Sequence, residues 1–245
     1  MKLAVIIPVY NAENTIRKAV KSIDTTHDVE IICINDGSTD RTKQVLTELQ
    51  KEVKHLIVYH QDNQGAAKSR NMGLSAMSDD IDAFMFLDAD DQFLPGKMDQ
   101  MIQYYEKNDH LDIVIGQIGR GMHGDWKVIP THEDIHREAM VSLAEAPEIL
   151  QSIGPGGKLF KAKFNTLRFD EDVVFCEEHT FVTRAYLMSR DIQLVPFIVY
   201  GYNEREGSIT DQRADTFISY LEDARKVRRE VMDMLLLVNE KAYYS

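Results

Sequence analysis

Apolar and polar positions alternate along the first half of the chain in a way that predicts short strands separated by helices. Continuous apolar runs, typical of strands buried on both faces, occur at residues 3–7, 30–35, 56–59, 83–87 and 112–116. Segments with apolar residues at helical spacing lie between them, at residues 13–23, 40–49, 65–77 and 95–107. This order predicts an α/β domain built on a doubly wound, mostly parallel sheet.

The second half is less regular, and its strongest signals lie near its end. Residues 125–147 are polar with mixed periodicity, whereas residues 177–189 predict a helix and residues 193–202 predict a strand. Residues 214–244 carry apolar positions at helical spacing and predict one long helix. We therefore expect one domain over residues 1–213, followed by a helical extension over residues 214–245.

Composition excludes several classes of protein. Of the 245 residues, 44% are hydrophobic and 28% are charged, and the formal net charge of -12 disfavours nucleic acid as a partner. A phosphate-bearing ligand would then need a metal ion or a local cluster of basic side chains. Cys33 and Cys176 form no metal-binding pair, and no apolar stretch is long enough to cross a membrane. We expect a protein of the reducing cytoplasm.

Three aspartates follow the predicted fourth strand, in the order Asp88-Ala89-Asp90-Asp91. Residues two apart at the end of a strand point the same way, so Asp88 and Asp90 can face one ligand. Their carboxylates suit Mg²⁺ or Mn²⁺. The alternative is a solvated turn, because short acidic motifs are common. For Asp91 we expect a different role, that of a cap on the following helix.

A further carboxylate, that of Asp36, stands at the end of the second strand. Ligands of open α/β sheets bind beyond the carboxyl ends of the strands, where Asp36 can accept hydrogen bonds from a base or a ribose. The alternative is a plain Asp-Gly turn formed with Gly37.

Four motifs in order carry a resemblance to a known family. They are VIIPVYN at residues 5–11, INDGSTD at 34–40, Asn63-Gln64-Gly65 with Arg70-Asn71, and FLDADD at 86–91. Together they resemble glycosyltransferase family 2, and the chain is similar to its wall teichoic acid and polysaccharide glycosyltransferases. The resemblance implies the GT-A fold, with a Rossmann-like nucleotide-binding half over residues 1–120 and an acceptor-binding half over residues 121–213.

The resemblance also implies roles for individual residues. Those near the nucleotide of a UDP-sugar would be Pro8, Tyr10 and Asp36 at the uracil, with Asn63 and Arg70 close by. Asp88 would meet the ribose and Asp90 would bind the metal, Mn²⁺ or Mg²⁺. Asn35 replaces the first acid of the usual Asp-Asp-Gly-Ser motif, at a position that we interpret as structural.

The family resemblance implies an inverting, single-displacement transfer, which needs a base to take the proton of the acceptor hydroxyl. The family places this base at the end of a Glu-Asp pair at the start of a helix. The matching pair here is Glu177-Glu178, so Glu178 is our candidate. The alternative is that the two acids only stabilise the helix dipole.

Two further segments resemble family motifs. Arg205 and Ser208 match an Arg-x-x-Ser segment that folds over the diphosphate of the donor, and a plain surface loop is the alternative. Lys158, after a glycine-rich loop, would touch the donor sugar or the acceptor.

The long C-terminal helix combines an apolar stripe with a basic cluster, Arg225, Lys226, Arg228 and Arg229. It can pack on its own domain. It can also dock on a partner, as in a homo-oligomer, or on an anionic membrane.

These observations predict a metal-dependent enzyme that transfers a sugar from a UDP-sugar to a hydroxyl of a glycan or cell-envelope polymer. We expect this enzyme in the cytoplasm, and the alternative is a peripheral position at the inner face of the membrane. One alternative is a non-catalytic module that binds sugar nucleotides or glycans. A sugar nucleotidyltransferase is the other, but it would need a basic, glycine-rich loop where residues 9–13 read VYNAE.

Overall fold

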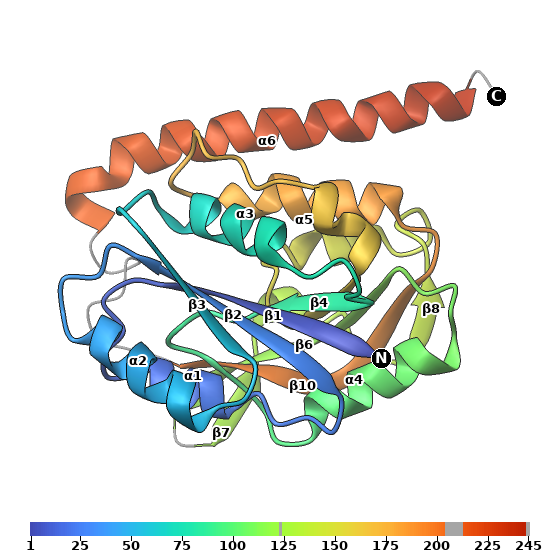
Figure 1. Ribbon diagram of the computed structural model, residues 1–245. Coiled ribbons are helices and arrows are strands. Elements are labelled where there is room, and N and C mark those ends of the chain that lie inside the picture. The colour runs from blue at the N-terminus through green and yellow to red at the C-terminus, as the bar shows by residue number, and fades with distance from the viewer. Residues whose placement is uncertain (123, 204–212, 244–245) are drawn as a thin grey trace.

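The computed structural model describes residues 1–122, 124–203 and 213–243, and its centre is one mixed sheet (Figure 1). The strands are β1 (Lys2–Val9), β2 (Asp28–Asp36), β3 (Leu56–Gln61), β4 (Ala83–Phe86), β5 (Gln92–Phe93), β6 (Ile113–Met122), β7 (Asp125–Val128), β8 (Ala139–Val141), β9 (Lys158–Lys161) and β10 (Ile192–Asn203). The helices are α1 (Ile16–Lys21), α2 (Thr42–Glu52), α3 (Ala66–Ala76), α4 (Lys97–Lys107), α5 (Glu177–Met188) and α6 (Arg213–Tyr243).

The sheet has the strand order β3-β2-β1-β4-β9-β6-β10-β5, with β7 beside β6 and β8 beside β10. Strands β1 to β4 are parallel, and so are β6 and β10. The short β9 lies between β4 and β6 and is antiparallel to both. This architecture confirms the predicted α/β class with a mostly parallel sheet and a long C-terminal helix.

Strict alternation along β1 explains how helices come to cover both faces. Leu3, Val5 and Ile7 point into one hydrophobic core, whereas Ala4 and Ile6 point into the other, and all five are fully buried. Helices α1, α2 and α4 cover the first face, and α3 and α5 cover the second (Figure 1). A strand that is buried on both faces reads as a continuous apolar run, which is the signal that the sequence carries.

An aromatic cluster fills the second core and joins the two halves of the chain. Phe84 and Phe86 of β4 contact Phe160 of β9, and Phe86 also contacts Phe181 of α5. Phe169 stacks on Phe181 with ring centroids 4.2 Å apart. Such ring pairs contribute about 0.5–1.5 kcal/mol each beyond the area that they bury. The cluster therefore fixes α5 against the end of β4.

Helix α6 lies across the outside of α5 and extends past it (Figure 1). Its inner face carries the fully buried Val227, and Asp223 accepts hydrogen bonds from the backbone N–H groups of Val174 and Phe175. This supports the interpretation that the helix packs on its own domain. Within the described residues, none of the helices has the length and apolar character needed to cross a membrane.

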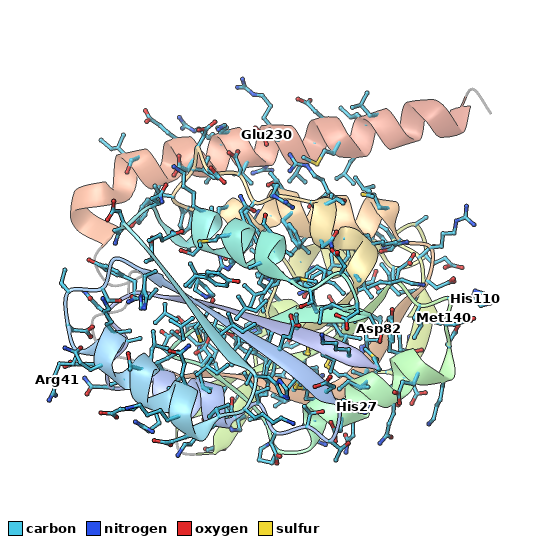
Figure 2. All side chains as sticks on the ribbon, viewed as in Figure 1. His27, Arg41, Asp82, His110, Met140 and Glu230 are labelled. Atoms are coloured by element: carbon cyan, nitrogen blue, oxygen red, sulfur yellow. The ribbon has the colours of Figure 1, made fainter. Side chains whose placement is uncertain are left out.

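Some of the side chains labelled in Figure 2 mark the two ends of the parallel strands. Arg41, which follows the end of β2, lies on one side of the molecule, whereas His27, Asp82 and His110, which precede β2, β4 and β6, lie on the other. The parallel strands β1, β2 and β4 therefore end together on the side of Arg41. Ligands of such sheets bind at this edge, so the fold assembles the predicted site residues there.

Candidate active site

The ends of β1 and β2 are tied together at this edge. Asn11 adopts a left-handed conformation with φ 46°, which lets its side chain accept a hydrogen bond from the N–H of Thr39 at 2.8 Å. Its own N–H donates to the hydroxyl of Ser38 at 3.0 Å. Tyr10 remains 51% exposed and Pro8 partly buried, so both stand at the open edge of the sheet.

Asp36 organises the loop that leads into α3. Its carboxylate accepts hydrogen bonds from the N–H groups of Gln64 and Gly65, both at 2.8 Å, and from the side chain of Gln61 at 2.7 Å. Asn63 is exposed in the same loop, and its backbone packs against Gly37, where φ is +67°. Asp36 thereby sets the position of Asn63, and the oxygen that binds Gly65 keeps capacity for one more hydrogen bond.

The structure explains why Asn35 can replace the first acid of the usual Asp-Asp-Gly-Ser motif. Asn35 is 3% exposed, its amide nitrogen lies 3.0 Å from Nδ1 of His60, and its amide oxygen accepts from the N–H of Ser38. Asn35 therefore links the end of β2 to β3 and to the following turn. This agrees with the structural role interpreted from the sequence.

Arg70 joins the turn after β4 to the start of α5. Its guanidinium, 6% exposed, donates to Asp88 at 3.0 Å and to Glu177 at 2.9 Å, residues 18 and 107 positions away. It lies over the ring of Phe169 at 5.4 Å from the centroid. Although burial opposes the charge, the carboxylates of Asp88, Glu177 and Glu178 keep the pKa of Arg70 above its ordinary value.

The turn after β4 corrects the expectation for Asp91. Helix α4 begins at Lys97 with Gly96 as its N-cap, so Asp91 does not cap it. Asp91 is instead 1% exposed and accepts hydrogen bonds from the hydroxyl of Tyr200 at 2.8 Å and the N–H of Asn203 at 3.0 Å. Burial, and next the charge of Asp88, raise the pKa of Asp91 to about 7.

The donor set of this turn fits a hard divalent cation. The side chain of Asp88 is 44% exposed, and Asp90 is partly buried beside it. In the part of the chain that the structure describes, no group of three or more His, Cys, Asp and Glu side chains is placed to hold a metal ion. That is compatible with Mg²⁺, which proteins commonly hold through one or two carboxylates together with phosphates of the substrate.

Glu177 and Glu178 open α5, where the preceding Cys176 has φ 66°. Burial, followed by the charge of Glu178, raises the pKa of Glu177 to about 7. Burial also opposes ionisation of Glu178, but the charge of Arg70 and a hydrogen bond from Glu177 hold the pKa of Glu178 below its ordinary value. Glu177 thus holds its proton more tightly than Glu178 does, a difference suited to proton transfer.

Lys158 is enclosed within the protein. It is fully buried, and its ammonium group donates to the hydroxyl of Ser152 at 2.7 Å and to the carbonyl of Gly154 at 2.5 Å. This burial disagrees with the expected contact of Lys158 with donor or acceptor, and the ammonium group holds the glycine-rich loop instead. Arg205 and Ser208 lie outside the described residues.

Sequence reasoning missed Tyr200 and Asn203, which anchor the Asp88–Asp91 turn. Tyr200 sits within a strand that reads as ordinary core, and nothing in the sequence indicates its partner more than a hundred positions away. Pairing of β10 with β5, the two-residue strand just after the turn, brings the two together.

Comparison with solved structures shows the same fold. S. aureus TarS 1-349 in complex with UDP-GlcNAc matches with a TM-score of 0.78 and 22% identity over 94% of this chain and 66% of that chain. The same fragment in complex with UDP gives a TM-score of 0.76 over 94% of this chain and 64% of that one. The chain thus spans about two thirds of the TarS fragment, and the likeness confirms the GT-A architecture.

Sequence relatives cover all or most of the chain. TagX of Staphylococcus aureus (strain MSSA476) is 37% identical over 249 residues, which cover 100% of this chain and 70% of TagX. Glycosyltransferase GlyA of Streptococcus pneumoniae serotype 4 is 31% identical over 93% of this chain and 34% of its own length. The model of Glycosyl transferase family 2 matches residues 4–175. Because that match spans more than half of the sequence, the chain belongs to glycosyl transferase family 2.

Proposed function

We propose that the chain transfers a sugar from a UDP-sugar to a hydroxyl of a glycan or cell-envelope polymer, with inversion, in one metal-assisted displacement. The observation that carries the proposal is the bridge of Arg70 between Asp88 and Glu177, at 3.0 and 2.9 Å. It joins the turn suited to the donor to the carboxyl pair suited to proton transfer, so both parts of a transfer reaction share one site.

The donor would lie along the ends of β1, β2 and β4. Pro8 and Tyr10 offer an exposed edge for the uracil, beside the loop that Asp36 holds and that carries Asn63. Asp88 would accept a hydrogen bond from the ribose. TarS has been solved with UDP and with UDP-GlcNAc, which makes UDP-GlcNAc the first donor to test. We assign Arg205 and Ser208 to the diphosphate as part of the same proposal.

Asp90 would hold the metal, Mn²⁺ or Mg²⁺, with oxygen atoms of the diphosphate. A bound cation would neutralise the charge that develops on the departing UDP. The chain's own contribution is a turn that presents carboxylate oxygen atoms outward from a buried strand.

Glu178 would act as the base. Its lowered pKa keeps the carboxylate ionised at neutral pH, ready to accept the proton of the attacking hydroxyl. Glu177, whose pKa is raised to about 7, holds a proton beside it and limits the repulsion between the two groups. A non-catalytic binding module, the competing hypothesis, would have no need of this difference in pKa.

We place the enzyme in the cytoplasm, against the inner face of the membrane. The outer side of α6 supports this location, because Ile218, Leu221, Met232 and Leu236 are exposed there near the basic cluster. Apolar and cationic side chains on one helix face suit an anionic lipid surface. Self-association through the same face is the alternative.

The test is to supply UDP-GlcNAc and other UDP-sugars with Mn²⁺ and polyol-phosphate or glycan acceptors, and to measure UDP release. NMR of the glycoside then reads the anomeric configuration. We expect acceptor-dependent UDP release and a β-linked product from the α-linked donor. An α-linked product would contradict inversion, and UDP binding without transfer in every combination would favour the binding module.

A further inference from the structure

The Asp88–Asp91 turn projects beyond its strand and is held from outside. Strand β4 pairs with β1 as far as Phe86, and the N–H of Leu87 still donates to the carbonyl of Ile6 at 3.0 Å. Beyond that point, the one backbone hydrogen bond seen within the described part of the turn runs from the N–H of Asp91 to the carbonyl of Asp88, at 3.1 Å. The turn therefore depends on other elements for its shape.

Groups from the end of β10 supply that support to the three aspartates of the turn. The hydroxyl of Tyr200 accepts a hydrogen bond from the N–H of Asp88 at 3.1 Å and donates to Asp91 at 2.8 Å. The N–H of Asn203 donates to Asp91 at 3.0 Å, and its amide nitrogen donates to the carbonyl of Asp90 at 2.6 Å. These four hydrogen bonds reach across more than a hundred positions and contact all three aspartates.

Two members of this support, Asp91 and Tyr200, lie in the interior of the protein. Asp91 is 1% exposed and Tyr200 is 3% exposed, and a hydrogen bond inside a protein is stronger than one in water. The ring of Tyr200 meets Phe93 edge-to-face at 6.0 Å. It also packs against Gly156, where an added Cβ would lie 3.1 Å from the ring. The hydroxyl is thus fixed in position by its ring.

We propose that Asp91, Tyr200 and Asn203 are positioning residues that hold the Asp88–Asp90 turn in the shape that binds the metal and the nucleotide. The donor-binding part of this inference rests on the proposed function. None of the three needs to touch the donor, since they act on the backbone of the turn. Their loss should therefore weaken the binding of nucleotide with metal, without removing a ligand of either.

The test compares Tyr200→Phe with Tyr186→Phe, a matched control. Tyr186 is 1% exposed, and its hydroxyl donates one buried hydrogen bond, to the carbonyl of Ser152 at 2.9 Å, away from the turn. Both changes remove one buried hydroxyl and keep the ring. Asn203→Ala is a second variant, because it removes the hydrogen bond to the carbonyl of Asp90 while leaving the core intact.

Two measurements are needed. NMR-detected hydrogen exchange of the Asp88 amide reads the turn itself, and calorimetric titration with UDP and Mn²⁺ reads its consequence. We expect Tyr200→Phe to speed exchange and to weaken UDP binding in Mn²⁺, each by roughly tenfold, and Tyr186→Phe to change neither. Asn203→Ala should also weaken UDP binding in the presence of Mn²⁺.

The outcomes separate this inference from the proposed function. Unchanged exchange at Asp88 in Tyr200→Phe would overturn the support of the turn, whatever UDP does. Faster exchange with unchanged UDP affinity would overturn its link to the donor. Wild-type protein that binds no UDP would overturn the proposed function and the donor-binding part of this inference, while the exchange measurement still decides the support of the turn.

Discussion

Two acidic clusters share the site, and they are held in opposite ways. In the turn after β4, Asp91 is buried under Tyr200 and Asn203, while the side chain of Asp88 remains 44% exposed. At the start of α5, the side chain of Glu177 is only 12% exposed. In the first cluster, Asp91 is buried while Asp88 is exposed to solvent. In the second cluster, the carboxylates are largely enclosed.

The difference suits two kinds of chemistry. Outward carboxylates can meet a cation or a ribose, whereas enclosed carboxylates have shifted pKa values and can hold or accept a proton. Arg70 touches both clusters, so its charge serves both. Similar residue types thus acquire separate roles from burial and neighbours, and three substitutions test that separation.

The largest effect is expected for Glu178→Gln. Removing the base should lower transfer by roughly 10³-fold, because general-base catalysis contributes about 10²–10⁴-fold. Affinity for UDP should stay within about twofold, since the change leaves the first cluster intact. Rates come from UDP release with donor and acceptor, and affinities from calorimetry.

Glu177→Gln is the matched control for that substitution. A glutamine resembles the protonated form of Glu177 and can still accept a hydrogen bond from Arg70, so most of the transfer rate should remain. If Glu178→Gln kept the wild-type rate, or if Glu177→Gln were the inactive variant, the assignment of the base would be wrong.

A smaller effect, on stability, is expected for Arg70→Met. It would leave the ionised carboxylates of Asp88 and Glu178 without their cation, and removing one partner from a largely buried charge cluster in this way costs about 3–5 kcal/mol of unfolding free energy. Denaturant unfolding measures the loss. Its control is Arg17→Met, because Arg17 also pairs with two carboxylates but at 36% exposure, where about 1 kcal/mol or less is expected. Equal losses in the two variants would contradict the joining role of Arg70.

The smallest effect concerns pH. The pKa of Glu177 is raised from 4.5 to about 7, so between these values the folded protein keeps a proton that the unfolded chain has lost. Unfolding free energy should therefore fall as pH rises through this window, by on the order of 2 kcal/mol from this group. Glu177→Gln should flatten that fall in denaturant titrations at pH 5 to 8. An unchanged slope would show that Glu177 titrates normally.

The regular half of the fold could be predicted from the sequence for a physical reason. Strands β1 to β4 are covered by helices on both faces, so each reads as an unbroken apolar run. The segments that escaped prediction are short strands, whereas α5 and β10 of the second half were predicted. Four-residue β9 follows a glycine-rich loop, and two-residue β5 has no period to detect.

Within the site, too, local motifs could be predicted, whereas contacts between distant parts of the chain could not. Asp88, Asp90 and Glu178 stand at ends of elements, and their local motifs were enough to single them out. Asp91 was misassigned as a helix cap because its partners, Tyr200 and Asn203, come from a strand more than a hundred positions away. Lys158 was expected at the ligand because the sequence does not indicate that β9 joins the sheet. The pairing of β9 with β6 buries Lys158.

In the proposed mechanism, the cluster after β4 binds the nucleotide through a metal ion held by Asp90. Calorimetric titration with UDP, with and without Mn²⁺, in wild type and Asp90→Asn tests it most directly. We predict that Mn²⁺ tightens UDP binding by roughly tenfold or more in the wild type, about 1.4 kcal/mol, and that Asp90→Asn loses this gain but binds metal-free UDP as before. Equal UDP affinity with and without Mn²⁺ in the wild type, or no binding at all, would contradict the account.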